Sequence, residues 1–374
     1  METPRVVSYK PTKNMTTNRT IAVGQASRLS PSSRKLETGW KPVLLCLALL
    51  STLNSQLSTA FAQGSLTPPG LPAPTMKSAD QIEPRTIVNA VNTPGNLPNA
   101  YSFVISQPGS YYLTTNLMFQ QYGASAAIAI ATNGVTLDLN GFTIPSIPGF
   151  TGPSSIGIML ASGVSDITII NGHINGGGNG IGITYLGNPP TNVLISKVSV
   201  SRVGVSGDGI NVGTGNATVV ENCTVTTAGG QGIVASIIKS SVATGCASNA
   251  IYGDTVSDCR GISSSTGVGS IRYGVYASFN AQNCYGSAGG SGIGLKAQCA
   301  INCIGTSTSD VGLFASMAQN CYGFSNSNIG LHAWIANGCS GTSYSGCGLE
   351  AISATSCLVG IGTTNITYHY NMPW

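Results

Sequence analysis

Four consecutive segments near the C-terminus repeat one pattern with a fixed period of 18 residues. Every segment places Gly, Leu, Ala and Cys at the same four positions. These columns are Gly294, Gly312, Gly330, Gly348; Leu295, Leu313, Leu331, Leu349; Ala297, Ala315, Ala333, Ala351; and Cys303, Cys321, Cys339, Cys357. A repeat this short does not bury its own apolar face and stacks on its neighbours, as in solenoids. Because Leu and Ala are two residues apart, they lie on the same side of a strand. The period therefore predicts one coil of a parallel β-helix.

The composition agrees with a solenoid and excludes two other classes of protein. Only 7% of the 374 residues are charged, whereas 49 are Gly, so Ser, Thr, Asn and Gly must cover most of the surface. A hydrophobic content of 42% argues against disorder. Before Gln63 there are eight Lys or Arg and two Glu, and after it eight basic and ten acidic residues. This near-neutral balance predicts no nucleic-acid partner.

Residues 1–62 resemble a secretory signal peptide with a long basic region. The apolar run Val43–Leu50 is followed by Ala60-Phe61-Ala62, which predicts cleavage after Ala62. The run is too short to cross a bilayer as a helix, so we expect no membrane span in the mature chain. An uncut anchor and a later start at Met15 remain alternatives. The chain is thus expected to be secreted or at the cell surface.

Three further segments follow. Residues 63–99 are rich in Pro and are predicted to be a linker. From Tyr101 the sequence alternates apolar and polar residues between turn signals, which predicts an all-β, single-stranded β-helix over 100–365. Residues 366–374 are predicted to be a C-terminal tail.

The turn after each strand allows the coils to be counted. The turns are placed at Asn140-Gly141, Asn171-Gly172, Lys197-Val198, Asn222-Cys223, Gly245-Cys246, Asp258-Cys259, Asn283-Cys284, Asn302-Cys303, Asn320-Cys321, Gly338-Cys339 and Ser356-Cys357. They predict about eleven coils, with one short interval of 13 residues before Asp258. A left-handed hexapeptide helix requires an aliphatic residue every six, but Leu331 is followed at that spacing by Asn337 and Ser343. We therefore expect a right-handed helix.

The first predicted coils carry a more specific likeness. The segments PGSYYLTTNL, VTLDLNGFTI and DITIINGHI resemble the first coils of secreted bacterial right-handed parallel β-helix proteins of the pectate-lyase-like superfamily. The resemblance covers about residues 85–365. It implies the fold but no single activity, because that superfamily includes lyases, hydrolases, epimerases, phage tailspikes and adhesins.

Ten of the eleven Cys residues follow the predicted signal peptide. Export permits disulfides. However, eight of the ten are assigned to one column, which favours inert thiols that fill a narrow core: Cys223, Cys246, Cys259, Cys284, Cys303, Cys321, Cys339 and Cys357. Some disulfides, including ones from the off-column Cys299 and Cys347, remain open. No second Cys or His repeats at ligand spacing, so no metal site is predicted.

Candidate catalytic residues are few. A glycoside hydrolase needs clustered carboxylates, and the sequence shows no such pair. The best candidates are Asp208, in the segment Arg202–Ile210, and Arg202 or Lys239 as base, which would suit a polysaccharide lyase. Ca²⁺ would be expected as a cofactor only in that case. The alternative is that Gly207-Asp208-Gly209 forms a corner of the coil.

A second column points to binding. Between Leu and Ala of each coil lies one outward side chain, and the column contains Asn211, Val234, Tyr252, Tyr276, Lys296, Phe314, His332 and Glu350. Aromatic side chains stack on sugars or on protein partners, so Tyr252, Tyr276, Lys296, Phe314 and His332 are the predicted ligand-binding residues. The alternative is ordinary covering of a sheet. Three functions stay open for this chain, which is expected to be a monomer: a binder of polysaccharide or surface glycan, a polysaccharide lyase or glycoside hydrolase, and a structural or adhesin-like surface protein.

Overall fold

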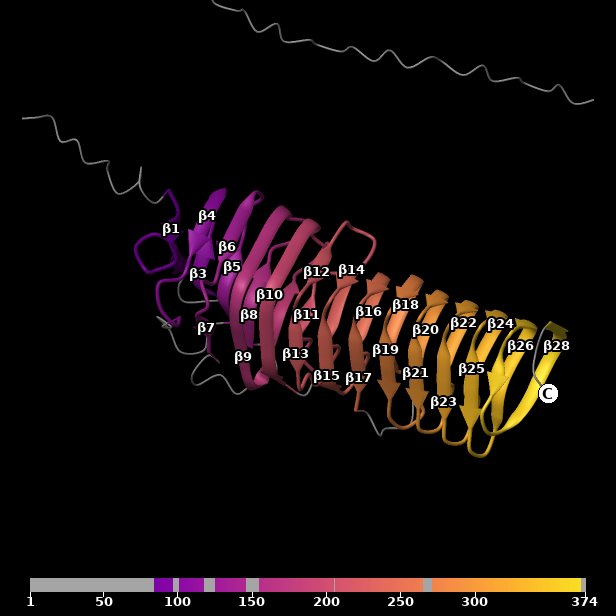
Figure 1. Ribbon diagram of the computed structural model, residues 1–374. Coiled ribbons are helices and arrows are strands. Elements are labelled where there is room, and N and C mark those ends of the chain that lie inside the picture. The colour runs from indigo at the N-terminus through magenta and orange to yellow at the C-terminus, as the bar shows by residue number, and fades with distance from the viewer. Residues whose placement is uncertain are drawn as a thin grey trace, which may run out of the picture. The chain divides into compact units, whose positions relative to one another are not determined.

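A computed structural model describes residues 84–96, 101–117, 125–145, 155–204, 206–264 and 271–370, all within a compact unit that spans Met76–Trp374. Over these residues the chain is all-β and contains strands but no helix (Figure 1). The predicted signal peptide, 1–62, and the first part of the predicted linker, 63–83, lie outside the described residues.

Short and long strands alternate along the chain. The first half contains β1 (Thr86–Ile87), β2 (Pro94–Asn96), β3 (Tyr101–Ile105), β4 (Gly109–Tyr112), β5 (Ala126–Ile130), β6 (Val135–Asp138), β7 (Thr143–Ile144), β8 (Ser155–Leu160), β9 (Ser165–Tyr185), β10 (Thr191–Val203), β11 (Ile210–Asn211), β12 (Val219–Glu221), β13 (Thr224–Thr226) and β14 (Ile233–Lys239). The second half contains β15 (Val242–Cys246), β16 (Ile251–Ser257), β17 (Arg260–Ser263), β18 (Tyr273–Gln282), β19 (Tyr285–Ala288), β20 (Ile293–Ile301), β21 (Ile304–Ser307), β22 (Leu313–Gln319), β23 (Tyr322–Ser325), β24 (Leu331–Asn337), β25 (Ser340–Ser343), β26 (Cys347–Thr355), β27 (Leu358–Val359) and β28 (Thr363–Tyr370).

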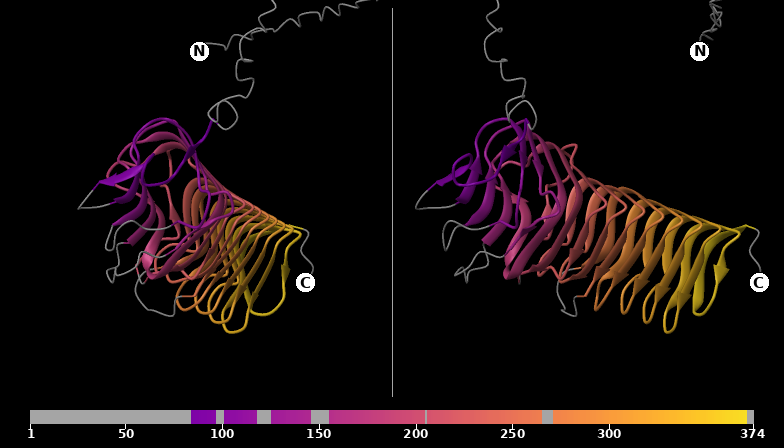
Figure 2. Two further views of the ribbon diagram at one scale, coloured as in Figure 1. Left: turned by 90° about the vertical axis from the view of Figure 1, so that its left-hand side faces the viewer. Right: turned by 60° about the vertical axis from the view of Figure 1, so that its left-hand side comes forward.

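The strands pair in parallel with the strand one coil away, which makes the unit a parallel β-solenoid (Figure 2). In a typical coil, β22 pairs with β20 and β24, while β23 pairs with β21 and β25. The register of β22 falls into two runs, 313–315 and 317–319. We call the stacked equivalents of these runs the first face and the second face, and the stack that contains β23 the third face. The predicted parallel stacking of the repeats is thereby confirmed.

A left-handed backbone residue joins the second face to the third in successive coils. The residues at this turn, all with positive φ, are Asn140, Asn171, Lys197, Asn222, Ser240, Asp258, Asn283, Asn302, Asn320, Gly338 and Ser356. Asn, Asp and Gly tolerate this conformation best, which explains why they dominate the column. The amides also form a short ladder, in which Asn302 donates to Asn283 and Asn283 donates to Asp258.

This turn corrects one sequence assignment. Cys246 does not belong to the Cys column, because it pairs with Ser263 on the third face. The position between Cys223 and Cys259 is held by Ser241, which follows the left-handed Ser240. The predicted interval of 13 residues was therefore wrong. It arose because a Gly-Cys pair on the third face resembles the Asn-Cys turns and a Ser-Ser turn does not.

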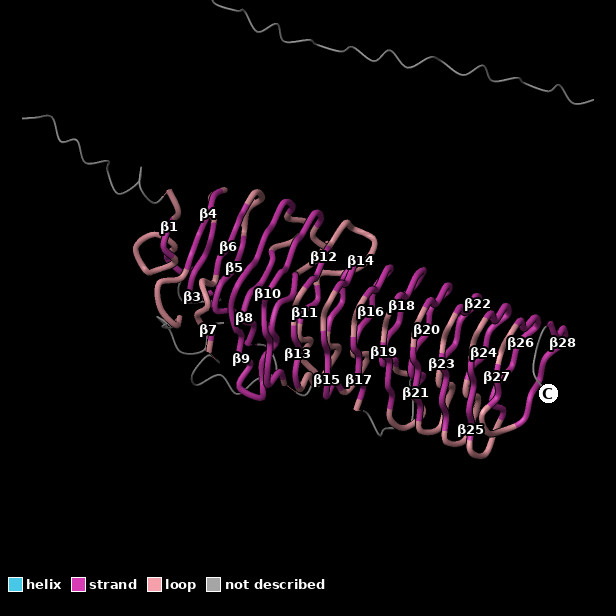
Figure 3. The backbone as a smooth tube through the Cα atoms, viewed as in Figure 1, coloured by secondary structure: helices cyan, strands magenta, loops and turns pink. Residues whose placement is uncertain are grey.

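The interior narrows along the solenoid. The inward residues at the middle of the third face are in register, and their side chains become smaller from the first coils to the last. They are Ile144, Ile174, Val200, Val225, Ala243, Gly261, Gly286, Gly305, Gly323 and Gly341. Across the interior, a nearly unbroken Gly column precedes the first face. A Cβ built on Gly323 would lie 2.2 Å from the carbonyl oxygen of Gly330, so two backbones meet there. The tube drawing shows the coils shortening toward the C-terminal strands (Figure 3).

Both predicted limits of the β-helix differ from the structure. β1 pairs in parallel with β4, and β2 pairs antiparallel with β3, although both lie within the predicted linker 63–99. Val88 and Thr93 are buried there, so this Pro-rich stretch adds to the first coil. At the other end β28 pairs with β26 as far as Tyr370, inside the predicted tail 366–374. The alternating Thr363–Tyr370 continues the register of the coil before it.

Candidate functional site

Asp208 lies in the loop that precedes the first face, where its carboxylate holds the corner by hydrogen bonds. Its carboxylate accepts hydrogen bonds from the backbone N–H of Gln231 at 2.8 Å and from Nδ2 of Asn211 at 2.7 Å. The same corner continues through Asn249, whose amide donates to Gln231 and accepts from the N–H of Tyr273. Asp208 therefore begins a polar ladder that ties successive corners together.

The structure does not join Asp208 to the two predicted bases. Arg202 is an exposed residue with positive φ at the end of the third face, and Lys239 is the last, exposed residue of β14 on the second face. Among the described residues, no hydrogen bond or ion pair connects any two of the three. The lyase-type triad that the sequence suggested is thus spread over different parts of the coil.

Every carboxylate in the described part of the chain is engaged in a hydrogen bond. Asp138 contacts Arg85 at 3.2 Å, and Asp310 accepts from Asn328 in the next coil. The others are Asp166, Asp208, Glu221, Asp254, Asp258 and Glu350. Their partners are largely Asn, Ser and backbone N–H groups, which are the donors that a stack of turns provides. These carboxylates therefore stabilise the turns around them through hydrogen bonds.

The predicted outward column is in register from Asn211 to Glu350, but Val234, which the sequence placed outward, is buried with 5% of its surface exposed. The rest of the column, from Tyr252 on, is half-buried. Tyr252 is opposite Tyr276, Tyr276 is opposite Lys296, and Lys296 is opposite Phe314. Phe314 is followed by His332 and Glu350. We call these six side chains the outward row. All of them are half-buried, and they lie on the first face over six successive coils.

The rings of the outward row stack on one another. Tyr252 and Tyr276 have centroids 4.9 Å apart and planes inclined by 16°, and Phe314 and His332 have centroids 4.7 Å apart and planes inclined by 4°. The Lys296 ammonium lies between the two pairs, 5.3 Å from the centroid of Tyr276 and 5.6 Å from that of Phe314. Such a cation is attracted by the faces of the rings. The row is therefore a stack in which a cation joins two aromatic pairs.

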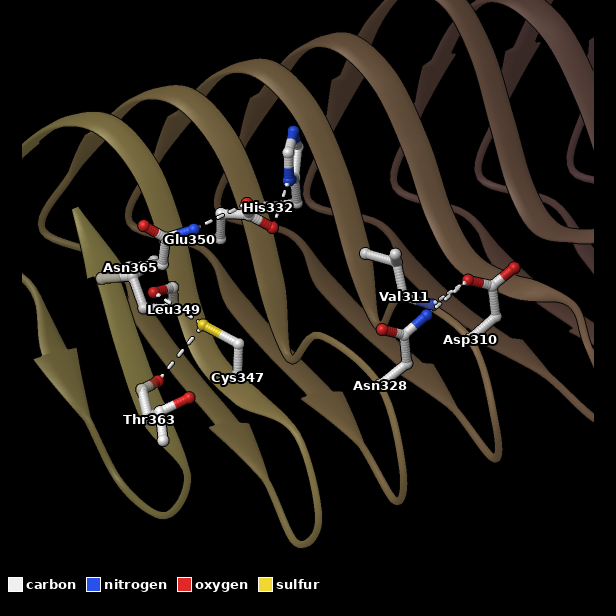
Figure 4. A network of polar contacts seen from close by, with 9 residues as sticks. All are labelled: Asp310, Val311, Asn328, His332, Cys347, Leu349, Glu350, Thr363 and Asn365. Atoms are coloured by element: carbon white, nitrogen blue, oxygen red, sulfur yellow. Dashed lines mark hydrogen bonds and ion pairs between the residues drawn. The ribbon is translucent and has the colours of Figure 1, made fainter. Parts of the chain in front are cut away.

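Hydrogen bonds extend the row beyond its rings (Figure 4). Nδ1 of His332 lies 3.0 Å from Oε2 of Glu350, and Nδ2 of Asn365 donates to Oε1 of Glu350 at 3.0 Å. At the other end, burial raises the pKa of Tyr252, and the nearby Tyr276 and Asp254 raise it further. The Tyr252 phenol thus stays protonated over a wider pH range than an exposed one.

This geometry corrects how the row would meet a ligand. The sequence suggested that each aromatic face stacks on a sugar, but the faces of Tyr252, Tyr276 and Phe314 are turned toward their neighbours in the row. A ligand that lies along the first face would meet ring edges, phenol groups, the ammonium and the carboxylate. The sequence analysis did not include Tyr273, which contacts Tyr276 at 4.9 Å, or Asn365 among the residues of the row. Tyr273 is the first residue of β18 and occupies the corner position that Asp208, Gln231 and Asn249 hold in earlier coils.

The ten Cys residues after the predicted signal peptide are free thiols in the structure. Eight are buried, whereas Cys299 and Cys347 are half-buried. The side-chain hydrogen bond with Cys284, together with burial, raises the pKa of Cys303 to about 12, while burial alone is the main cause of a similar rise at Cys259. The Cys259 and Cys303 thiols are therefore protonated at neutral pH, as expected for core residues.

Over the residues that the structure describes, no three His, Cys, Asp or Glu side chains are grouped to hold a metal ion. In the same residues, no helix has the length and hydropathy to cross a membrane. No protein-family model matches the chain, and neither a curated protein nor a solved structure matches it.

Proposed function

We propose that this protein is a secreted or cell-surface binder of an extended polysaccharide or surface glycan, built as a right-handed β-helix of about eleven coils. Connections between parallel strands of one sheet are right-handed in about 98% of cases, which supports the handedness. The turn residues from Asn140 to Ser356 support the number of coils. The resemblance to the pectate-lyase-like superfamily and a signal peptide over 1–62 belong to the same proposal.

The outward row is the observation that carries the binding proposal. Its six side chains advance by one strand spacing per coil, so they extend over about 24 Å along the solenoid. A polymer with a repeating unit fits a surface on which side chains recur once per coil. The row offers apolar ring edges beside hydrogen-bonding groups, which is the combination that sugars need. Because the rings are already stacked, little side-chain entropy is lost on binding.

A non-catalytic role fits the polar groups better than an enzymatic one. Asp208 already accepts two hydrogen bonds that hold a corner, and Glu350 already accepts bonds from His332 and Asn365. A general acid or base needs a free path to its substrate. The structural or adhesin-like role remains the second candidate, because part of the second face is apolar and exposed.

The test compares two pairs of tyrosines. Tyr252→Ala/Tyr276→Ala removes one stacked pair from the outward row, while Tyr285→Ala/Tyr322→Ala removes two side chains from the third face as a matched control. Retention on a panel of insoluble glycans is expected to fall at least tenfold for the first variant and to be unchanged for the second. Thermal unfolding of both variants checks that the solenoid is intact. Equal retention by the parent and both variants, or no retention by the parent, would contradict the proposal.

A further inference from the structure

An exposed apolar cluster lies on the second face of the last coils. Five of its side chains are half or more exposed, namely Met317 50%, Trp334 59%, Ile335 52%, Ile352 52% and Tyr368 56%. Met317 is opposite Ile335, and Tyr368 lies two coils beyond Ile335, with Ser353 in the coil between them. Trp334 and Ile352 lie beside them at the corner that leads from the first face. We call these five residues the second-face cluster.

The area of the cluster matches one side of a stable interface. Counted at roughly 200 Å² per large side chain, the exposed parts amount to on the order of 500 Å². This is near the upper end for the largest apolar patch of an ordinary monomer, which is about 300–600 Å². A standard interface covers about 800 Å² per partner, of which about 57–65% is apolar. The cluster therefore supplies about the apolar area that one such partner contributes.

In the last five coils the second face carries no charge. Its outward residues in the last five coils are Cys299, Ile301, Met317, Gln319, Ile335, Asn337, Ser353, Thr355, Tyr368 and Tyr370. The first face differs, since it carries Lys296 and Glu350 in the same coils, whereas the third face there is also without charge. In a two-fold dimer each residue near the axis meets its own copy, so a charged residue there repels itself. A charge-free apolar face avoids that penalty.

We propose that the second-face cluster docks a second copy of this chain and gives a two-fold symmetric dimer. Two sheet faces with the same strand spacing pack about 10 Å apart with their side chains interlocked. The sequence led us to expect a monomer, because the period predicts which residues face outward but not how many neighbouring outward positions are apolar. The outward row of the first face stays open in such a dimer, so the inference is independent of the proposed glycan binding.

Sedimentation velocity of the full chain over a range of concentrations tests the proposal. The parent is expected to sediment as a dimer that dissociates on dilution. Ile335→Lys places two like charges in the contact and is expected to be monomeric, and the uncharged Ile335→Asn is expected to weaken association at least tenfold. Leu358→Lys is the matched control, because Leu358 is 55% exposed on the third face. This variant is expected to associate as the parent does.

Several results would overturn the proposal. A parent that remains monomeric at every concentration contradicts it, as does a parent that stays monomeric but binds lipid vesicles. Equal association of Ile335→Lys and Leu358→Lys would place the contact on another face. Thiol labelling gives a second measure, because Cys299 lies beside Met317 on the same face. Cys299 should react more slowly in the associated parent than in Ile335→Lys, with Cys347 as the internal reference.

Discussion

The earlier and later coils of this solenoid fill their interiors differently. In the earlier coils the third face fills the interior with branched side chains such as Val200 and Val225, which pack against Gly182 and Gly209. In the later coils Gly305 and Gly323 let the third face contact the backbone of Gly312 and Gly330 directly. Wide coils are thus held by side-chain packing, and narrow coils by close backbone approach. The 18-residue period occurs in both regions, because Asn222, Ser240 and Asp258 are 18 residues apart as well.

The thiols separate the two regions most strongly. After the predicted signal peptide no Cys precedes Cys223. The folded-state pKa is raised from 9.0 to about 12 at Cys246, Cys259, Cys303 and Cys321, and to about 11 at Cys223 and Cys339. A raised pKa contributes stability that is fully present below pH 9 and is lost as the pH rises toward about 12. At pH 10 each such thiol costs about 1.4 kcal/mol relative to neutral pH.

We therefore predict that alkali unfolds the narrow coils first. Four of these thiols, Cys259, Cys303, Cys321 and Cys339, belong to the coils with Gly on the third face, and four such losses approach the whole stability of a domain, about 5–15 kcal/mol. Far-UV circular dichroism with limited proteolysis between pH 7 and 11 measures this. Cys303→Ala/Cys321→Ala is expected to lose about 3 kcal/mol less than the parent between pH 7 and pH 10. An unchanged pH dependence in that variant would show that the thiols do not drive the transition.

The packing difference itself can be tested with single methyl groups. Gly323→Ala brings a Cβ within 2.2 Å of the carbonyl oxygen of Gly330, and backbone cannot move aside as a flexible side chain would. We expect a loss of about 3 kcal/mol or more in the free energy of unfolding. Val225→Ala, at the same position of a wide coil, leaves a small cavity and is expected to cost about 2 kcal/mol. Denaturant unfolding of both variants checks the order, and the reverse order would refute the distinction between the regions.

The corners of the two regions are held by different side chains that are expected to contribute similar amounts to stability. Asp208 holds a wide corner, whereas Ser325 holds a narrow one by donating to the carbonyl of Asp310 at 2.6 Å and accepting from the N–H of Asn328. We expect Asp208→Ala and Ser325→Ala to destabilise by about 1–3 kcal/mol each, since each leaves a backbone group without its partner. Arg202→Ala and Lys239→Ala are expected to lie within about 0.5 kcal/mol of the parent. If Asp208 were catalytic, Asp208→Ala would instead abolish a polysaccharide-cleaving activity with little change in the free energy of unfolding.

The sequence predicted more of the narrow coils than of the wide ones. The columns from Lys296 to Glu350 were correctly placed because the flanking Gly, Leu and Ala recur every 18 residues. The coil before Cys259 was misplaced because Ser241 substitutes for Cys in the core while Cys246 occurs elsewhere, and side-chain size alone does not tell the two positions apart. The stacking of Tyr276 on Tyr252 could not be foreseen, since it depends on the rotamers of neighbouring coils. Similarly, the Pro-rich stretch around Val88 gave a linker signal although it pairs with β4.

The most direct test of the binding account is the dependence of affinity on ligand length. If the outward row binds a polysaccharide along the first face, oligosaccharides of a retained glycan should bind more tightly as they lengthen, and the gain should stop when the ligand reaches about 24 Å. Isothermal titration calorimetry over a series of defined lengths measures this. Affinity that rises and then becomes constant at that length is the predicted result. Affinity that is independent of length, or that is unchanged in Tyr252→Ala/Tyr276→Ala, would contradict recognition by the row.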